Sequence, residues 1–536
     1  MLARAVDVLA LALLLFALLV PHQLVRLTPG AFARIPVEAL VAVALVLVVP
    51  WRAARIVVGA CAVVLGLLTL GAFFDMGFDA VLTRPFDPVL DWVVVSDGVE
   101  FLTSSVGRTG AIAAVVGAIV LTVAVLVLVT AAALRLGRLT TRHRGSATAL
   151  TAVLAVAWLT GATFGVDVAP GEPVAAAGAA SAARDRVVQV RAGIQDQAAF
   201  RALAAVDRYR NTPPDQLLTG LRGKDVLVAF VESYGRSAVE DPAMAPGVDA
   251  VLDDGTRRLA AAGFGARSAF LHSPTAGGGS WLAHSTTLSG LWIDNQQRYR
   301  TLVSSDRLTL NGAFHRAGWR TVGIMPGVTL TWPEGSFYDF DHITDSRTMG
   351  YDGPHFSWAP MPDQYALAVL QRTELDRRDR PPVMAELPMV SSHAPWAPIP
   401  RMVDWATLGD GSLFGPISAA GARPESVWAS STGVKNAYRD SIEYSLSALI
   451  SWVTTYGDDR TVLVFLGDHQ PAPIVTGPDA GRDVPITVVA HDPKVLDRIS
   501  DWGWTSGLNP APAAPVWRMD TFRDHFIGAF SPATPR

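Results

Sequence analysis

With 536 residues the chain is too long for one ordinary domain, and 50% hydrophobic residues, 17% charged residues and a mean hydropathy of +0.30 are unusual for a soluble protein. The formal net charge of −4 argues against a nucleic-acid partner, since a nucleic-acid-binding surface needs an excess of basic residues. The only cysteine, Cys61, lies in an apolar run, so cysteine supplies neither a nucleophile nor a metal site elsewhere in the chain.

Five apolar runs occupy the first third of the sequence and are predicted to be membrane-spanning helices. A helix needs about 20 apolar residues to cross a hydrocarbon core about 30 Å thick. A cleaved signal peptide accounts for the first run alone. The predicted spans are residues 5–24, 37–51, 56–74, 111–134 and 147–164, and the second is the shortest.

Arginines between the spans predict their orientation. Arg52 and Arg55 lie between the second and third spans, and four arginines lie between the fourth and fifth. Loops rich in basic residues stay in the cytoplasm, so the N-terminus is predicted inside and the chain after residue 164 outside. The predicted parts are a transmembrane domain (1–168), a linker with an amphipathic helix (169–222) and an extracytoplasmic domain (223–536).

From residue 223 the sequence predicts an α/β sandwich with a central, mostly parallel sheet. Continuous apolar runs are typical of strands buried on both faces, and here they alternate with helical segments. Residues 399–434 are predicted to be irregular. The predicted strands are 226–231, 266–272, 319–325, 383–390, 461–466 and 485–490, and the predicted helices are 258–262, 281–291, 308–318, 363–372 and 437–456.

Polar residues follow the ends of these strands: Glu232, Ser280, His393, Asp468 and His469. Strand ends gather along one sheet edge, where α/β proteins bind ligands. Two carboxylates, a hydroxyl and an imidazole suit zinc or manganese, and such a cation makes a serine hydroxyl nucleophilic. Ser280 follows three glycines and begins a predicted helix, where an anion is stabilised. His393 is expected to bind the transferred group or to protonate the leaving oxygen.

This arrangement resembles the alkaline phosphatase superfamily, and specifically its sulfatase-like membrane branch, the lipoteichoic acid synthases and phosphoethanolamine transferases. The motifs are FVES, GGGSW, SSHAPW and FLGDHQ. The resemblance implies one divalent metal, manganese or zinc with magnesium also possible. Glu232, Ser280, Asp468 and His469 would be its ligands, Ser280 the nucleophile, and His393 a phosphate contact. The family nucleophile is usually threonine.

The resemblance further implies a multi-pass cell-membrane enzyme. It would move a phospho-alcohol headgroup from a phospholipid, through covalently modified Ser280, to a cell-envelope glycolipid or glycan. Two alternatives stay open: a phosphodiesterase or phosphatase that uses water as acceptor, and a catalytically inactive scaffold for envelope assembly. Sulfate ester hydrolysis is not predicted, because the sequence Ser280-Trp-Leu-Ala-His284 lacks the proline and arginine of the sulfatase modification signal.

Four further residues are candidates for substrate binding, namely Thr275, Trp281, Trp332 and Glu334. Lipoteichoic acid synthases carry an arginine two residues after the tryptophan, and here Glu334 takes that place. Because a carboxylate repels a phosphate, Glu334 is expected either to meet a cationic headgroup or a sugar hydroxyl, or to be a surface turn residue. His355 and His491 are candidates for a second metal site.

Overall fold

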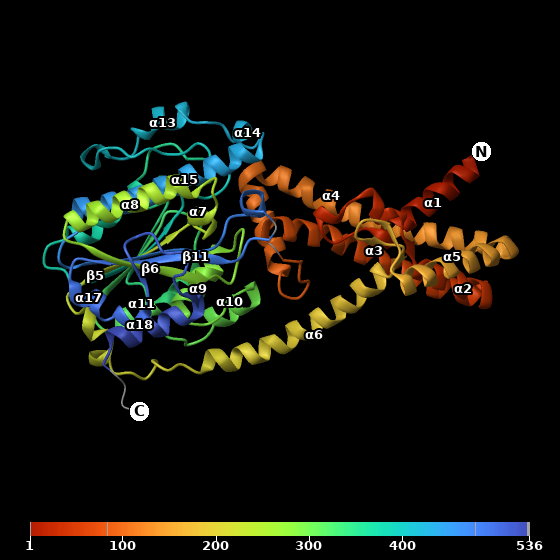
Figure 1. The fold of residues 1–536 in the computed structure, drawn as a ribbon, viewed down its shortest axis with the longest axis horizontal. Coiled ribbons are helices and arrows are strands. Elements are labelled where there is room, and N and C mark those ends of the chain that lie inside the picture. Colours follow the sequence, from red (N-terminus) through yellow and green to blue (C-terminus); the bar gives the residue numbers. More distant parts are fainter. Residues whose placement is uncertain (1, 83, 478, 533–536) are drawn as a thin grey trace. The chain divides into compact units, whose positions relative to one another are not determined.

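The computed structural model describes residues 2–82, 84–477 and 479–532, apart from the side chain of Leu2 and some side chains within residues 92–106. The chain divides into two compact units. The first comprises Met1–Ala80 and Arg84–Asp196, and the second comprises Val81–Thr83 and Gln197–Arg536. Figure 1 shows the helices and strands of both units, and each unit is described by itself below.

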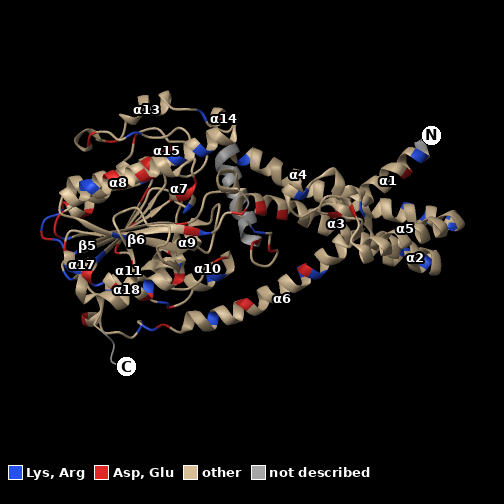
Figure 2. Ribbon diagram, in the orientation of Figure 1, with Lys and Arg blue, Asp and Glu red and all other residues tan. Residues whose placement is uncertain are grey.

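The first unit is helical. Three of its helical segments, Trp51–Leu82, Gly107–Arg142 and Arg144–Phe164, are long and apolar enough to cross a membrane. Figure 2 shows long stretches of these helices without a charged residue. Gly107 has non-helical backbone angles and interrupts the longest helix. The helices are α1 (Leu2–Leu19), α2 (Val37–Val48), α3 (Trp51–Leu82), α4 (Trp92–Arg142) and α5 (Arg144–Phe164).

All five predicted spans are helical, and the last three meet the length and composition of a membrane span. The second is a shorter apolar helix, so a count of five spans and their orientation stay predictions. Helix α6 (Gly178–Ala205) lies within residues 169–222, the predicted linker with its amphipathic helix. Short strands complete the unit: β1 (Ile35–Pro36), β2 (Asp167–Ala169), β3 (Glu172–Pro173) and β4 (Ala175–Ala176).

The second unit is built on a mixed nine-stranded sheet with the order β12-β6-β11-β10-β5-β9-β7-β8, in which β13 also pairs with β6. Strands β10, β5, β9, β7 and β8 are parallel, whereas β11 is antiparallel to both β10 and β6. The strands are β5 (Asp225–Val231), β6 (Gly265–His272), β7 (Arg320–Met325), β8 (His342–Asp345), β9 (Val383–Met389), β10 (Thr461–Gly467), β11 (Asp483–Ala490), β12 (Thr505–Ser506) and β13 (Val516–Arg518).

Helices cover both faces of this sheet, as the alternating sequence pattern predicts. In Figure 1, α8 and α15 lie on one face, and α9, α11 and α18 lie on the other. Every residue of β10 is buried, which explains its uninterrupted apolar sequence. The helices are α7 (Ser237–Glu240), α8 (Ala245–Ala261), α9 (Ser280–Ser289), α10 (Gln296–Val303), α11 (Leu310–Arg316), α12 (Asp363–Leu370), α13 (Phe414–Ala420), α14 (Pro424–Val427), α15 (Ser431–Tyr456), α16 (Pro473–Thr476), α17 (Pro493–Asp497) and α18 (Phe522–Phe530).

The predicted fold class is confirmed, and the six predicted strands are all present within a residue or two. Several details were predicted wrongly. Helix α8 begins at Ala245 instead of residue 258, and residues 399–434 contain the short helices α13 and α14. The edge strands β8, β12 and β13 were missed because runs of two to four residues carry too little periodicity to be recognised.

Candidate nucleophile and metal site

The loop after β6 places Ser280 beside the end of β10. Gly277 and Gly279 have φ angles of +74° and +81°, which glycine adopts without steric cost. The N–H of Gly277 donates to the main-chain oxygen of Gln470 at 2.8 Å, so the loop is fixed to the segment that follows β10. Ser280 is then the first residue of α9, and its hydroxyl lies at the helix N-terminus.

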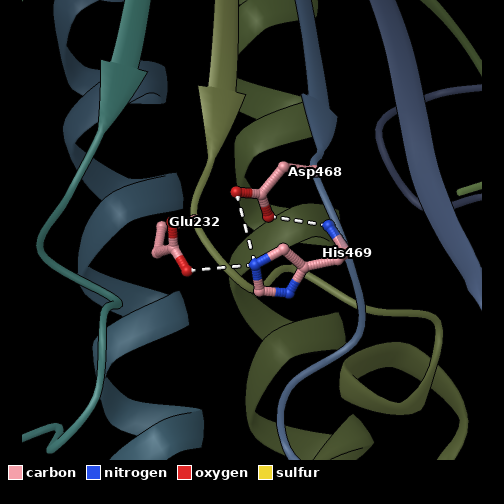
Figure 3. A group of neighbouring side chains, drawn as sticks. All are labelled: Glu232, Asp468 and His469. Carbon is pink, nitrogen blue, oxygen red and sulfur yellow. Dashed lines mark hydrogen bonds and ion pairs between the residues drawn. The ribbon is translucent and has the colours of Figure 1, made fainter. Parts of the chain in front are cut away.

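Ser280 contacts two side chains that come from other strand ends. Its hydroxyl donates to Oε2 of Glu232 at 2.9 Å, and its oxygen lies 3.2 Å from Nε2 of His469. Glu232, Asp468 and His469 form the acidic cluster, in which one potential ligand atom from each residue lies within 4.8 Å of the others. Figure 3 shows the three side chains pointing toward one another.

Asp468 is fully buried, and its two oxygens have different environments. Oδ1 accepts the backbone N–H groups of Ser233 and His469, both at 2.7 Å. Oδ2 has no hydrogen-bond partner among the described residues and lies 3.8 Å from Nε2 of His469. The other ring nitrogen, Nδ1, donates to the main-chain oxygen of Gln470 at 2.8 Å and so leaves the Nε2 lone pair for a ligand. A buried carboxylate oxygen that accepts no hydrogen bond is suited to bind a cation.

The two carboxylates have opposite pKa shifts. Burial by itself would raise the pKa of Glu232, but the charges of His469 and His393 lower it to about 2. Burial and the charge of Glu232 raise the pKa of Asp468 to about 7. The pair therefore resists carrying two negative charges without a cation, and a bound divalent metal ion would supply the compensating positive charge.

The segment that carries His393 is connected to Glu232 by a hydrogen bond from the preceding residue. The hydroxyl of Ser392 donates to the main-chain oxygen of Glu232 at 2.6 Å, which joins the segment after β9 to the end of β5. Nδ1 of His393 donates to the main-chain oxygen of Ala394 at 2.6 Å, and the ring stacks on Trp358 with centroids 3.8 Å apart. The imidazole is therefore held in one orientation.

The predicted substrate-binding residues close to Ser280 have different surroundings. Thr275 is buried, and its hydroxyl has no partner among the described residues. Trp281 is 43% exposed, and its indole N–H donates to Gln296 at 2.9 Å. An exposed tryptophan beside Ser280 is accessible from solvent, whereas Thr275 lies inside the loop.

Trp332 and Glu334 belong to a separate aromatic loop. The Trp332 ring packs against Tyr338 and Phe340, with centroids 5.6 and 6.5 Å away. Glu334 is exposed. Within the described residues no hydrogen bond or ion pair joins either side chain to the acidic cluster.

Of the histidines considered for a second metal site, neither joins the acidic cluster. His355 is exposed. His491 follows β11, which is antiparallel to β10, so that Ala490 pairs with Val462 at the start of β10. His491 therefore lies at the sheet edge opposite the site, edge-on to Phe264.

His284 is a neighbour of the site that the sequence reasoning missed. It lies one helical turn after Ser280, and its ring stacks on Phe230 with centroids 4.0 Å apart. Nε2 lies 3.9 Å from Oδ2 of Asp468. Burial lowers the pKa of His284 to about 3, against the opposing charge of Glu232, so the ring is neutral. The spacing of four residues from Ser280 was the available signal, since such residues share a helix face.

No protein-family model and no curated protein matches the chain. Among solved structures, the lipoteichoic acid synthase LtaP from Listeria monocytogenes is 15% identical, with 55% of this chain and 70% of that chain covered and a TM-score of 0.35. The soluble domain of lipooligosaccharide phosphoethanolamine transferase A from Neisseria meningitidis is 14% identical (60% and 93% covered, TM-score 0.36). The phosphoglycerol transferase GacH from Streptococcus pyogenes is 10% identical (62% and 90% covered, TM-score 0.35).

These structures come from the group that the sequence motifs resemble, and a 2-O sulfatase is also among the similar structures. Likenesses of this size carry no argument about activity.

Proposed function

We propose that this protein is a membrane-bound, metal-dependent phosphotransferase with Ser280 as its nucleophile. The observation that supports it most is the position of the Ser280 hydroxyl, 2.9 Å from Glu232 and 3.2 Å from His469 at the first residue of a helix. A hydroxyl in such a place is ready to be ionised and to attack a phosphorus atom.

Glu232, Ser280, Asp468 and His469 would hold one divalent ion. Oxygen and nitrogen ligands suit manganese or zinc, and magnesium would accept the oxygens. The bound ion would supply the positive charge that lowers the pKa of the serine hydroxyl and neutralises the phosphate oxygens.

In the proposed first step, Oγ of Ser280 forms a bond to the phosphorus of a phospholipid headgroup, and the bond from phosphorus to the diacylglycerol oxygen breaks. The serine proton is released to solvent, because Glu232, whose pKa is lowered to about 2, is too weak a base to keep it, and His393 gives a proton to the departing diacylglycerol oxygen. The N–H groups at the start of α9 bind the phosphate oxygens. The phospho-alcohol then remains on Ser280.

In the second step, a hydroxyl of a cell-envelope glycolipid or glycan attacks the same phosphorus. The bond between phosphorus and Oγ breaks, the attacking hydroxyl gives its proton to His393, and Ser280 takes a proton from solvent. The candidate membrane helices of the first unit support a lipid as donor. We further propose that residues 1–168 form the membrane domain, that 169–222 link it to the rest, and that 223–536 form an extracytoplasmic catalytic domain.

Peptide mass spectrometry across Ser280 tests this function. Purified protein is incubated with manganese or zinc and a mixture of bacterial phospholipids. We expect a mass increment on Ser280 whose size identifies the headgroup, and no increment in Ser280→Ala. Ser304→Ala, an exposed serine on the same unit, is the matched control and should behave like the wild type.

The same experiment separates the alternatives. Transfer of the headgroup to a labelled acceptor alcohol supports the transferase. Release of the free phospho-alcohol into water, even though the acceptor alcohol is present, supports a hydrolase. If metal-loaded protein gives no adduct and Ser280→Ala complements cells as well as the wild type does, the enzyme proposal is wrong and a scaffold is favoured.

A further inference from the structure

A cavity lies at the edge of the sheet opposite the acidic cluster. It is lined in part by the first residues of three neighbouring parallel strands, β5, β9 and β10. The acidic cluster follows the last residues of β5 and β10, and each of these strands is seven residues long, so about 20 Å of strand separate the two places. The cavity measures about 370 Å³, a volume usual for small-molecule pockets.

The lining of this cavity combines a buried apolar part with exposed polar groups. Asp376, Tyr456 and Asp458 are exposed to solvent. An apolar interior with a few polar groups is typical of pockets that bind small organic molecules. The buried apolar residues of the lining include Val226, Leu227, Leu370, Val383, Ala385 and Val462.

Two polar side chains of the lining carry buried atoms without a partner. Nε1 of Trp452, on α15, has no hydrogen-bond acceptor in the described part of the chain, although the residue is only 3% exposed. Oε1 of Gln371 likewise accepts no hydrogen bond there, while Nε2 of the same amide donates to Asp376 at 2.7 Å. Because buried polar groups are nearly always paired, the cavity offers one free donor and one free acceptor to a bound molecule.

Gln371 belongs to an unusual turn of helix. Residues Gln371–Leu375 form a π-helical turn directly after α12, and the N–H of Asp376 donates to the main-chain oxygen of Gln371 at 2.8 Å. Single π-helical turns are rare in proteins and are frequent at functional sites. This turn and the residue after it contribute Gln371, Leu375 and Asp376 to the lining of the cavity.

The charged groups of the lining favour a cation. Arg380 neutralises Asp225, because its two terminal nitrogens donate to the two carboxylate oxygens at 2.7 and 2.8 Å. Asp376 accepts from the amide of Gln371, and Asp458 accepts the N–H of the residue two positions later at 2.9 Å. Neither carboxylate makes an ion pair with a basic side chain in the part of the chain that the structure describes. Two negative charges therefore remain at the cavity.

We propose that this cavity binds a small organic cation that also carries a hydroxyl or carbonyl oxygen, such as an amino alcohol or an amino sugar. Its charged nitrogen lies beside Asp376 and Asp458 and donates to Oε1 of Gln371, and its oxygen accepts the indole N–H of Trp452. Its carbon atoms pack against the buried apolar residues. The site is separate from Ser280 and does not rest on the proposed function.

Ligand-observed saturation-transfer NMR on the full-length protein in detergent tests this proposal. The probes are serinol and glucosamine, and their uncharged counterparts are glycerol and glucose, in which a hydroxyl replaces the ammonium group. A chelator first removes divalent ions, so that the acidic cluster cannot hold a probe through a metal. We expect saturation transfer to the two charged probes and little to the uncharged ones.

Three substitutions locate the bound probe. Trp452→Phe removes the N–H and keeps an aromatic ring, Gln371→Leu removes the free acceptor, and Asp458→Asn removes one charge. We expect each to weaken binding by about three- to tenfold, the effect of losing one polar contact. Trp502→Phe changes a tryptophan that packs against Trp504 outside the cavity, and this matched control should bind like the wild type.

Each outcome decides for or against the cation site. Because Asp458 is exposed, Asp458→Asn keeps the test decisive if circular dichroism shows that a buried substitution unfolds the protein. No saturation transfer to either charged probe would mean that the cavity holds water only and would overturn the proposal. Equal binding of the uncharged counterparts, or unchanged binding in the folded variants, would overturn it too. The adduct on Ser280 is measured separately, so the proposed function stands or fails independently.

Discussion

At the residue scale, the site depends on an unusual backbone angle next to Glu232. Ser233 has a φ of +58°, which is uncommon for a residue with a side chain. Its N–H donates to Oδ1 of Asp468 at 2.7 Å, and its main-chain oxygen accepts the hydroxyl of Tyr438 at 2.8 Å. These bonds hold the strained residue, and through it the two carboxylates are kept close together.

A second buried carboxylate, Glu386 of β9, makes stability depend on pH. Nδ2 of Asn311 donates to Oε2 of Glu386 at 2.8 Å. Burial, opposed by this bond, raises the pKa of Glu386 from 4.5 to about 7. The folded protein therefore holds this proton more tightly than the unfolded chain does. The contribution of this proton to the free energy of unfolding is fully present below about pH 4.5 and is lost as the pH rises through about 7.

We expect Glu386→Gln to raise the free energy of unfolding at pH 8 by up to about 3 kcal/mol, because the amide is neutral and still accepts from Asn311. The gain should shrink as the pH falls toward 5. Urea unfolding across this pH range, followed by tryptophan fluorescence, measures it. Identical pH profiles for the two proteins would contradict the expectation.

At the scale of elements, the pairing of the parallel strands β5 and β10 positions the two carboxylates of the acidic cluster. Val231 pairs with Gly467, so the next residues, Glu232 and Asp468, leave the sheet side by side. Gly467 permits this close approach: a Cβ there would lie 1.9 Å from the main-chain oxygen of Tyr234. Only a residue without a side chain fits between β10 and the turn after β5.

Gly467→Ala is therefore expected to lower the free energy of unfolding by about 1–3 kcal/mol, because the backbone of one turn must move. The shift displaces Asp468, so metal affinity should fall as well. Denaturant unfolding and Mn²⁺ calorimetry measure the two effects. Gly481→Ala, where the new Cβ meets nothing within 4 Å, is the matched control and should leave both unchanged.

At the scale of the whole molecule, three helices are long and apolar enough to cross a membrane, and the proposed position of the α/β unit outside the cytoplasm can be tested by its topology. Ser146 and Ser304 are exposed and lie on opposite sides of the membrane if the predicted orientation holds. In a Cys61→Ser background, we expect Ser304→Cys to react with an impermeant maleimide in intact cells (spheroplasts, if an outer barrier blocks the reagent). Ser146→Cys should react only after permeabilisation, and the reverse pattern would invert the topology.

The sequence by itself determined the class of fold and the polar residues that follow three of its strands. Apolar runs identify buried strands because a strand that is buried on both faces has apolar residues at consecutive positions. Glu232, Ser280, Asp468 and His469 were singled out because each follows such a run or its loop, and the structure brings them together.

Only the tertiary structure decided which neighbours these residues have. Strand direction comes from pairing between distant segments, so the antiparallel β11, and with it the position of His491 at the far edge, has no local signature. His284 became visible only when α9 was placed against β5 and β10, because a distance of 3.9 Å to Asp468 depends on how three elements pack. Local pattern fixes the elements, and long-range packing fixes the contacts between their side chains.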